Sequence, residues 1–226
     1  MNTIRFSRRQ LFTLAIGSSL CLLSAGLSHP AQAGRDKFIL QCQSPTPATT
    51  SSSYPGSGKI ILSNNLARPA GKSSDAPGQL LYIEGRVMDQ NCVPVSNAMI
   101  DIWQTDPFGK YRFATRDELL TPEPIFAGSG RAVTDNLGRY RFTTLFPSGY
   151  GNNAPHIHMR IMHPDFNLLD TTMYFRGDRR NTTDPRFKAF KPDSQELLLG
   201  DIIPRNGSLD VRFNITLKGT AKTRNY

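Results

Sequence analysis

The feature of this sequence that most constrains its fold is a strict alternation of apolar and polar residues near its C-terminal end. Between residues 209 and 218 every odd position is apolar and every even position is polar. This period of two is typical of a strand with one buried face. Shorter stretches with the same period occur at 80–88, 98–102 and 138–142. Many short strands separated by turns predict an all-β fold, namely a β-sandwich of short, mostly antiparallel strands.

Helical signals are few. Asp184-Pro185 is typical of an N-cap followed by proline at the first helical position. No long amphipathic pattern occurs, so we expect at most one or two short helices. The sequence has no phosphate-binding glycine loop and no Gly-x-Ser-x-Gly elbow, which argues against nucleotide-dependent and serine-hydrolase chemistry.

The first 33 residues are typical of an export signal. Arg8 and Arg9 precede an apolar run from Leu11 to Leu27, and a small-residue cleavage site, Ala31-Gln32-Ala33, follows. The run is too short and too interrupted for a stable membrane span. A twin arginine in this position is typical of the bacterial twin-arginine route, and an ordinary secretory signal is the alternative. Both interpretations predict an exported protein, periplasmic or secreted.

Beyond the signal we expect one domain. Residues 34–79 are rich in Ser, Thr, Pro and Gly and suit an irregular N-terminal arm. Residues 80–218 carry the strand pattern, and residues 219–226 form a basic tail. Two cysteines, Cys42 and Cys92, lie outside the signal. Because disulfides form in oxidising compartments, we expect a Cys42–Cys92 disulfide that ties the arm to the domain.

The net charge of the chain gives little information about the class of molecule that it binds. Removing the signal takes away three arginines and no acid, so the formal charge of +9 falls to +6 over 193 residues. A basic surface suits an anionic small molecule or simply solubility. Lys and Arg do not alternate with aromatic residues as a nucleic-acid groove requires, so we expect no nucleic-acid partner.

The strongest local signal for chemistry is His156-Ile157-His158. On a strand, residues i and i+2 point to the same face, so two imidazoles placed in this way can bind one metal ion. Two tyrosines precede the pair, Tyr150 in a Pro-Ser-Gly-Tyr segment and Tyr111 after a Gly-Lys turn. A phenolate is a hard anionic donor that suits Fe(III), and a bound cation can deprotonate a tyrosine. Each of these residues alone also suits a solvent-facing strand or a strand end.

As a set, these segments make the sequence resemble the intradiol ring-cleavage dioxygenases, the group of protocatechuate 3,4-dioxygenase and catechol 1,2-dioxygenase. The resemblance runs from about Asn64 to Asp178. Besides the two tyrosine segments and the His pair, it includes the following stretches in order: Asn65–Lys72, Gly85–Asp89, Asp101–Gln104, Gly130–Asp135 and Met173–Asp178.

The resemblance implies a β-sandwich enzyme with one Fe(III) per chain. The metal ligands implied by the family are Tyr111, Tyr150, His156 and His158. Tyr150 is then the axial ligand that leaves when a catechol-type substrate binds. With O₂ the aromatic ring is cleaved between its two hydroxyl-bearing carbons, which yields a cis,cis-muconate-type diacid. The metal acts as template and Lewis acid.

Two positions depart from the family pattern. Asn153 stands where members of the family usually carry an arginine, and Thr172 stands where they usually carry a glutamine. Asparagine donates a hydrogen bond but supplies no charge. Arg131, Arg139 or Arg160 could supply the missing charge. The four ligand positions therefore match the family pattern, while two positions around them do not.

Two other interpretations remain. Gly85–Asp89 and Thr134–Phe142 also resemble transthyretin-like repeats, so the chain could be a non-catalytic exported binding module. A cupin-like enzyme would also use a His-x-His strand, but it needs a further His and a carboxylate, and no such set is visible. The sequence does not specify which catechol is the substrate, and a homo-oligomer is left open.

Overall fold

A computed structural model describes residues 42–50 and 54–220. The expected export signal at 1–33 lies outside the described residues, as do residues 34–41, 51–53 and 221–226 of the expected arm and tail. Within the described part, no helix is long and apolar enough to span a bilayer.

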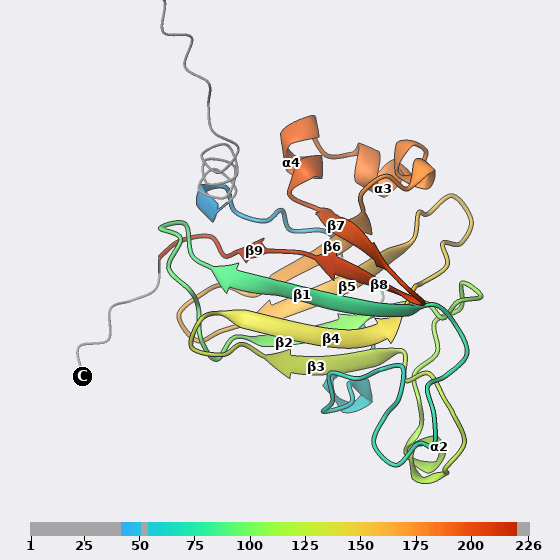
Figure 1. The fold of residues 1–226 in the computed structure, drawn as a ribbon. Helices are drawn as coiled ribbons and strands as arrows, with labels where there is room; N and C mark the ends of the chain where they lie inside the picture. The colour runs from blue at the N-terminus through green and yellow to red at the C-terminus, as the bar shows by residue number, and fades with distance from the viewer. Residues whose placement is uncertain (1–41, 51–53, 221–226) are drawn as a thin grey trace, which may run out of the picture.

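Strands dominate the fold (Figure 1), which confirms the all-β prediction. One sheet has the strand order β3-β2-β5-β6-β7-β8-β1-β4, and β9 pairs with β1. Most pairings are antiparallel, whereas β1 with β8, β1 with β9 and β6 with β7 are parallel. The strands are β1 (Leu80–Met88), β2 (Met99–Trp103), β3 (Ser129–Val133), β4 (Arg139–Leu145), β5 (His156–Met162), β6 (Leu169–Phe175), β7 (Leu199–Arg205), β8 (Ser208–Arg212) and β9 (Ile215–Thr216).

The sheet nearly closes on itself, and hydrogen bonds connect its two halves at two places. β7 pairs with both β6 and β8 and thereby joins the two halves. At the other end of the strand order, residues 63–64 bridge the edge strands. The carbonyl of Ser63 accepts from the backbone of Arg131 on β3 at 2.9 Å, and that of Asn64 accepts from Thr143 on β4 at 2.8 Å.

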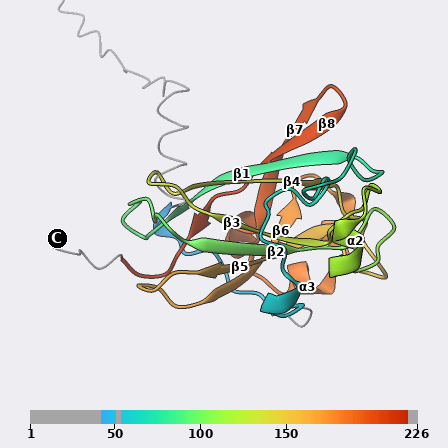
Figure 2. The ribbon, with the colours of Figure 1, turned by 90° about the horizontal axis from the view of Figure 1, so that it is seen from below.

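The main core lies between the two halves of the sheet, which Figure 2 shows one above the other. Ile157, Met159 and Ile161 of β5 face Leu81 and Ile83 of β1 across this core, and all five are almost fully buried. The alternation therefore places His156 and His158 on the opposite face of β5, away from the main core.

The expectation of at most one or two short helices was too low. The described residues contain α2 (Arg116–Leu120), α3 (Pro185–Lys188) and α4 (Pro192–Glu196), with 3-10 turns η1 (Ser57–Lys59) and η2 (Arg179–Thr182). α3 begins at Asp184 as expected, because the side chain accepts from the backbone of Arg186 and Phe187. α4 repeats the proline start, and α2 uses a capping box; these local signals are enough for one helical turn without an amphipathic pattern.

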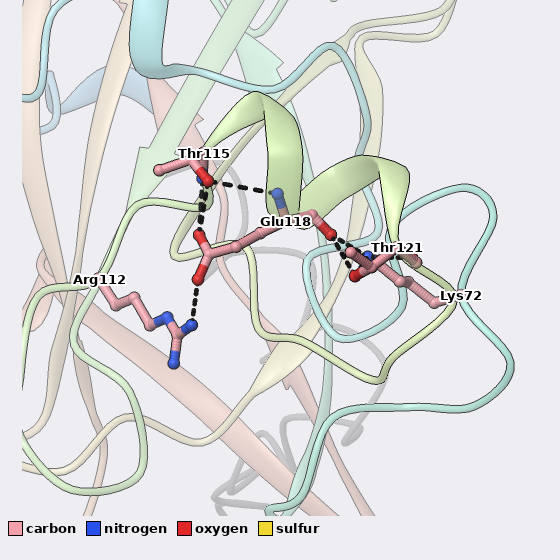
Figure 3. A network of polar contacts seen from close by, with 5 residues as sticks. All are labelled: Lys72, Arg112, Thr115, Glu118 and Thr121. Atoms are coloured by element: carbon pink, nitrogen blue, oxygen red, sulfur yellow. Dashed lines mark hydrogen bonds and ion pairs between the residues drawn. The ribbon is translucent and has the colours of Figure 1, made fainter.

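The capping box of α2 is part of a polar network around Glu118 (Figure 3). The carboxylate of Glu118 accepts from the backbone of Thr115 at 2.9 Å and pairs with Arg112. The Glu118 and Thr121 carbonyls accept from Lys72. This network fixes α2 against the segment that contains Tyr111, the residue before Arg112.

The described part of the arm is attached to the domain, and the predicted disulfide is confirmed. Cys42 and Cys92 are bonded, with 5.2 Å between their Cα atoms. Beyond the disulfide the arm follows β9 and β6, since Thr46 donates to the Thr216 carbonyl and Thr49 to the Asp170 carbonyl, both at 2.9 Å. The arm therefore runs alongside β6, the strand that pairs with β5.

Candidate metal centre and active site

Three of the predicted ligands meet at one point. The hydroxyl oxygen of Tyr111 lies 3.0 Å from Nε2 of His158 and 3.4 Å from Nε2 of His156. The two Nε2 atoms are 3.2 Å apart. Ligands held about 2.1 Å from one metal ion at right angles lie about 3.0 Å from each other. The three donor atoms therefore have the separations that neighbouring ligands of one ion require.

Burial keeps both imidazoles in the form that binds metal. His156 and His158 are almost fully buried, and this burial is the main cause that lowers the pKa of each, His158 most strongly. The positive charge of Arg186 lowers both pKa values further. Both rings are consequently neutral at neutral pH, as a metal ligand must be.

Two loops bring the tyrosines to the histidines. The loop after β2 turns at Gly109, which has a φ of +80°, and Asp106 accepts from Phe108 and Lys110 to close the turn. A Cβ on Gly109 would lie 3.2 Å from the Gly149 carbonyl and 3.6 Å from Tyr150. Glycine therefore permits the close contact between the Tyr111 loop and the Tyr150 loop.

The fourth predicted ligand, Tyr150, lies beside the other three. Its ring centroid is 5.9 Å from that of Tyr111 and 6.0 Å from that of His156. Its hydroxyl accepts a hydrogen bond of 3.4 Å from Arg186. Tyr150 thus borders the point where the donor atoms meet, with a hydroxyl that also contacts a cation from α3.

Backbone and carboxylate groups orient His156. Its Nδ1 donates to the carbonyl of Ala154 at 2.6 Å, so Nε2 is the atom left for a metal. The amide of Ala154 donates to the fully buried carboxylate of Asp184 at 2.8 Å. Because Asp184 also caps α3, this one side chain connects the orientation of His156 to the start of the helix.

Hydroxyl groups and a stacked ring orient His158. Thr172 lies opposite His158 on β6, and its Oγ1 is 3.2 Å from Nδ1 of the histidine. Thr49 of the arm reaches Thr172 with 2.8 Å between the two hydroxyl oxygens. On the other side, the Trp103 ring stacks on His158 at 5.1 Å between centroids. Metal-binding histidines commonly have such partners, which fix the ring and its tautomer.

The three arginines named from the sequence as sources of charge are paired with carboxylates. Arg131 binds Asp101 at 2.5 and 2.8 Å, and Arg160 binds Asp170 at 2.6 and 2.7 Å. Arg139 forms an exposed pair with Asp135 at 2.7 Å.

The sequence reasoning missed Arg186, the arginine that does contact the candidate site. Asn153 lies on the Tyr150 loop, and its backbone amide donates to the Tyr150 carbonyl at 2.9 Å. The Asp184-Pro185 signal predicted the helix that positions Arg186 but not the direction of its side chain.

The donor set determines which metal suits this point. In the part of the chain that the structure describes, no group of three or more His, Cys, Asp and Glu side chains could hold a metal ion. Any metal at the meeting point must therefore use a phenolic oxygen with the two imidazoles. Such a set differs from a zinc site and from the carboxylate-containing set of a cupin.

Comparison with known proteins identifies the family. A family model described as "Dioxygenase" matches residues 61–219. The protocatechuate 3,4-dioxygenase beta chain of Burkholderia cepacia is 32% identical over 72% of this chain and 74% of its own length. The chain belongs to the intradiol ring-cleavage dioxygenase family. It is therefore an oxidoreductase of the dioxygenase type.

Other relatives agree with this membership. The alpha chain of protocatechuate 3,4-dioxygenase from Pseudomonas putida is 30% identical over 71% of this chain and 79% of its own length. The solved dioxygenase domain of a dioxygenase–carbohydrate-binding fusion from Streptomyces is 26% identical, with a TM-score of 0.61, over 77% of this chain and 99% of that domain. Membership of the dioxygenase family favours the enzyme over the binding module.

Proposed function

We propose that this intradiol dioxygenase contains one Fe(III), held by Tyr111, Tyr150, His156 and His158, and cleaves a catechol to a cis,cis-muconate-type diacid. The observation that carries the proposal is the convergence of the Tyr111 oxygen and the two histidine Nε2 atoms within 3.4 Å. Phenolate and imidazole together suit a hard trivalent ion, and two phenolates offset much of its charge.

The reaction would conserve every atom of both reactants. Catechol, C₆H₆O₂, gains both atoms of O₂ and becomes a diacid of composition C₆H₆O₄. The ferric ion would supply a template and a Lewis acid for the two catechol oxygens. In this chain, Tyr150 would make room for the substrate, and its phenolate oxygen would take up one of the two catechol protons. A hydroxide displaced at the same time would take up the other.

The remaining residues of the site would hold the two imidazoles in position and would not react themselves. His156 would stay fixed through Ala154, whose carbonyl accepts from its Nδ1, and His158 through Thr172, whose hydroxyl oxygen lies 3.2 Å from its Nδ1. Trp103 stacks on His158 and closes one side of the site. These contacts keep the two imidazoles in place while Tyr150 moves.

An oxygen-uptake assay with product analysis tests this function. Catechol and protocatechuate are supplied separately to the iron-loaded protein, and the His158→Ala variant is the control. For either substrate we expect one O₂ consumed per ring and incorporation of both atoms of ¹⁸O₂ into the product, identified by NMR. Catechol should give a symmetrical diacid, and protocatechuate its unsymmetrical derivative with a third carboxylate. A semialdehyde acid of the same mass, or hydrogen peroxide in place of a ring-opened product, would contradict the proposal.

We further propose that the protein acts outside the cytoplasm and leaves by the twin-arginine route. The Arg8-Arg9 signal motif motivates this, and the Cys42–Cys92 disulfide supports an oxidising compartment. Cell fractionation of a double variant, Arg8→Lys with Arg9→Lys, tests the route. Loss of the exported form is expected, whereas unchanged export would favour the ordinary secretory signal.

A further inference from the structure

Arg186 is the cation next to the ligand that is expected to move. Its Nη2 donates to the Tyr150 hydroxyl at 3.4 Å, and its Cζ lies 5.9 Å from the centre of the Tyr150 ring. Its Nε is buried, and this atom has no hydrogen-bond partner in the described structure. A buried N–H of a charged group without a partner is costly, which suggests that a bound molecule supplies one.

The helix start holds Arg186 in this place. The carboxylate of Asp184 accepts from the backbone amide of Arg186 at 2.8 Å and from that of Ala154 at 2.8 Å. Ala154 in turn accepts from His156. Arg186 is therefore fixed by the same buried side chain that orients a metal ligand, and its position relative to the site is not left to a mobile loop.

The other cations of this region are used elsewhere. Arg131 and Arg160 each bind an aspartate through two nitrogens, and Arg180 donates to the Gly151 carbonyl at 2.9 Å. In the described residues no ion pair joins Arg186 to a carboxylate, and Asn153 is neutral. Arg186 is thus the guanidinium that lies close to the site and still has an N–H free to bind an anion.

We propose that Arg186 is a substrate-binding residue, which donates its Nε–H to an ionised oxygen of the bound catechol. This assignment rests on the function proposed above. The Nη2 atom keeps its contact with Tyr150, so one guanidinium contacts both the outgoing hydroxyl and the incoming oxygen. The site consequently selects ring substrates that bind with their hydroxyl oxygens ionised, and the charge absent at position 153 comes from α3.

Anaerobic substrate binding tests this assignment without relying on turnover. Wild-type protein, Arg186→Gln and Arg186→Lys are loaded with iron, and catechol is titrated into each without oxygen while the visible spectrum is followed. The matched control is Arg179→Gln, since Arg179 lies seven residues earlier in the 3-10 turn η2 and is exposed.

We expect Arg186→Gln to keep wild-type iron content and to bind catechol about 10- to 100-fold more weakly, the range for a lost charged hydrogen bond. Arg186→Lys should lie between the two, because it keeps the charge but not the planar donor geometry. Arg179→Gln should bind like the wild type.

Three results overturn the assignment, and each has a different meaning. Unchanged catechol affinity in Arg186→Gln leaves the proposed iron site standing and removes only the role of Arg186. Loss of iron in Arg186→Gln makes Arg186 a support for the metal site rather than a substrate contact. A wild-type protein that binds no iron removes the proposed function and the assignment together.

Discussion

The hydroxyl oxygen of Tyr111 lies 3.0 Å from Nε2 of His158, although 47 residues separate them in the chain. The approach depends on a turn at Gly109 that lets the Tyr111 loop contact the Tyr150 loop. It also depends on Trp103, the last residue of β2, which pairs with His158 on the neighbouring strand β5. The Tyr111 loop begins directly after Trp103. The strand and the loop together therefore form the candidate metal centre.

The three converging residues that we propose as ligands should be individually necessary for iron. We expect His156→Ala, His158→Ala and Tyr111→Phe each to lower iron content below about one tenth of wild type, since each removes a ligand and leaves the others incomplete. Metal analysis of the purified proteins checks this.

His163→Ala is the matched control for the ligand variants. It removes an imidazole from the residue just after β5, where the ring contacts Phe166 instead. Full iron content in Tyr111→Phe would show that the Tyr111 phenol is not a ligand.

Thr172 should tune iron binding through His158. Replacing Thr172 by valine keeps the side-chain shape but removes the hydroxyl next to Nδ1. We expect about 10- to 100-fold weaker iron binding, the usual cost of losing such a partner. Thr49→Val, one hydroxyl further away, should have a smaller effect. Competition with a chelator measures the iron affinity of both variants, and Thr143→Val on β4 is the control. Equal iron affinity in all three variants would exclude a role for the Thr172 and Thr49 hydroxyls.

Asp184 should be a stability centre. It is fully buried and accepts from the backbone of Ala154, Arg186 and Phe187. Asp184→Ala leaves these amides without a partner, and we expect a loss of about 2–4 kcal/mol in the free energy of unfolding. Urea denaturation of the metal-free protein measures it. Asp193→Ala, in the exposed first turn of α4, should cost less than about 0.5 kcal/mol.

The Glu118 network predicts a response to acid. Hydrogen bonds from the Thr115 backbone, then from Arg112 and from the Thr115 hydroxyl, lower the Glu118 pKa from 4.5 to about 2. A lowered folded-state pKa means that this stabilisation is present above about pH 4.5 and is lost as the pH falls towards about 2. Glu118→Gln should therefore flatten the stability profile in this window, with a small amplitude because the pair is partly exposed. An unchanged pH profile in Glu118→Gln would rule the network out.

Much of the fold could be read from local pattern. The alternation at 80–88 predicted β1, and the capping signal at Asp184 predicted the start of α3. The sequence also predicted that His156 and His158 share a face, since that follows from the period of a strand. The extra helices were missed because a single capped turn, such as Thr115 with Glu118, has no amphipathic repeat to detect. The division into two sandwich layers stays a prediction.

The surroundings of the site could not be read in the same way. The family resemblance named Tyr111 as a ligand, but no spacing rule places its oxygen next to His158. Arg186 and Thr49 lie in segments with no pattern that points towards the site, and only the packing of α3 and the arm brings them there. Spacing within one strand predicts a shared face, whereas contacts between distant segments depend on the complete fold.

The most direct test of the ferric centre is a visible spectrum of the purified wild-type protein with an iron assay on the same sample. We predict about one iron per chain and a tyrosinate-to-iron(III) charge-transfer band that shifts when catechol is added without oxygen. A colourless protein that takes up no iron on reconstitution would contradict the account.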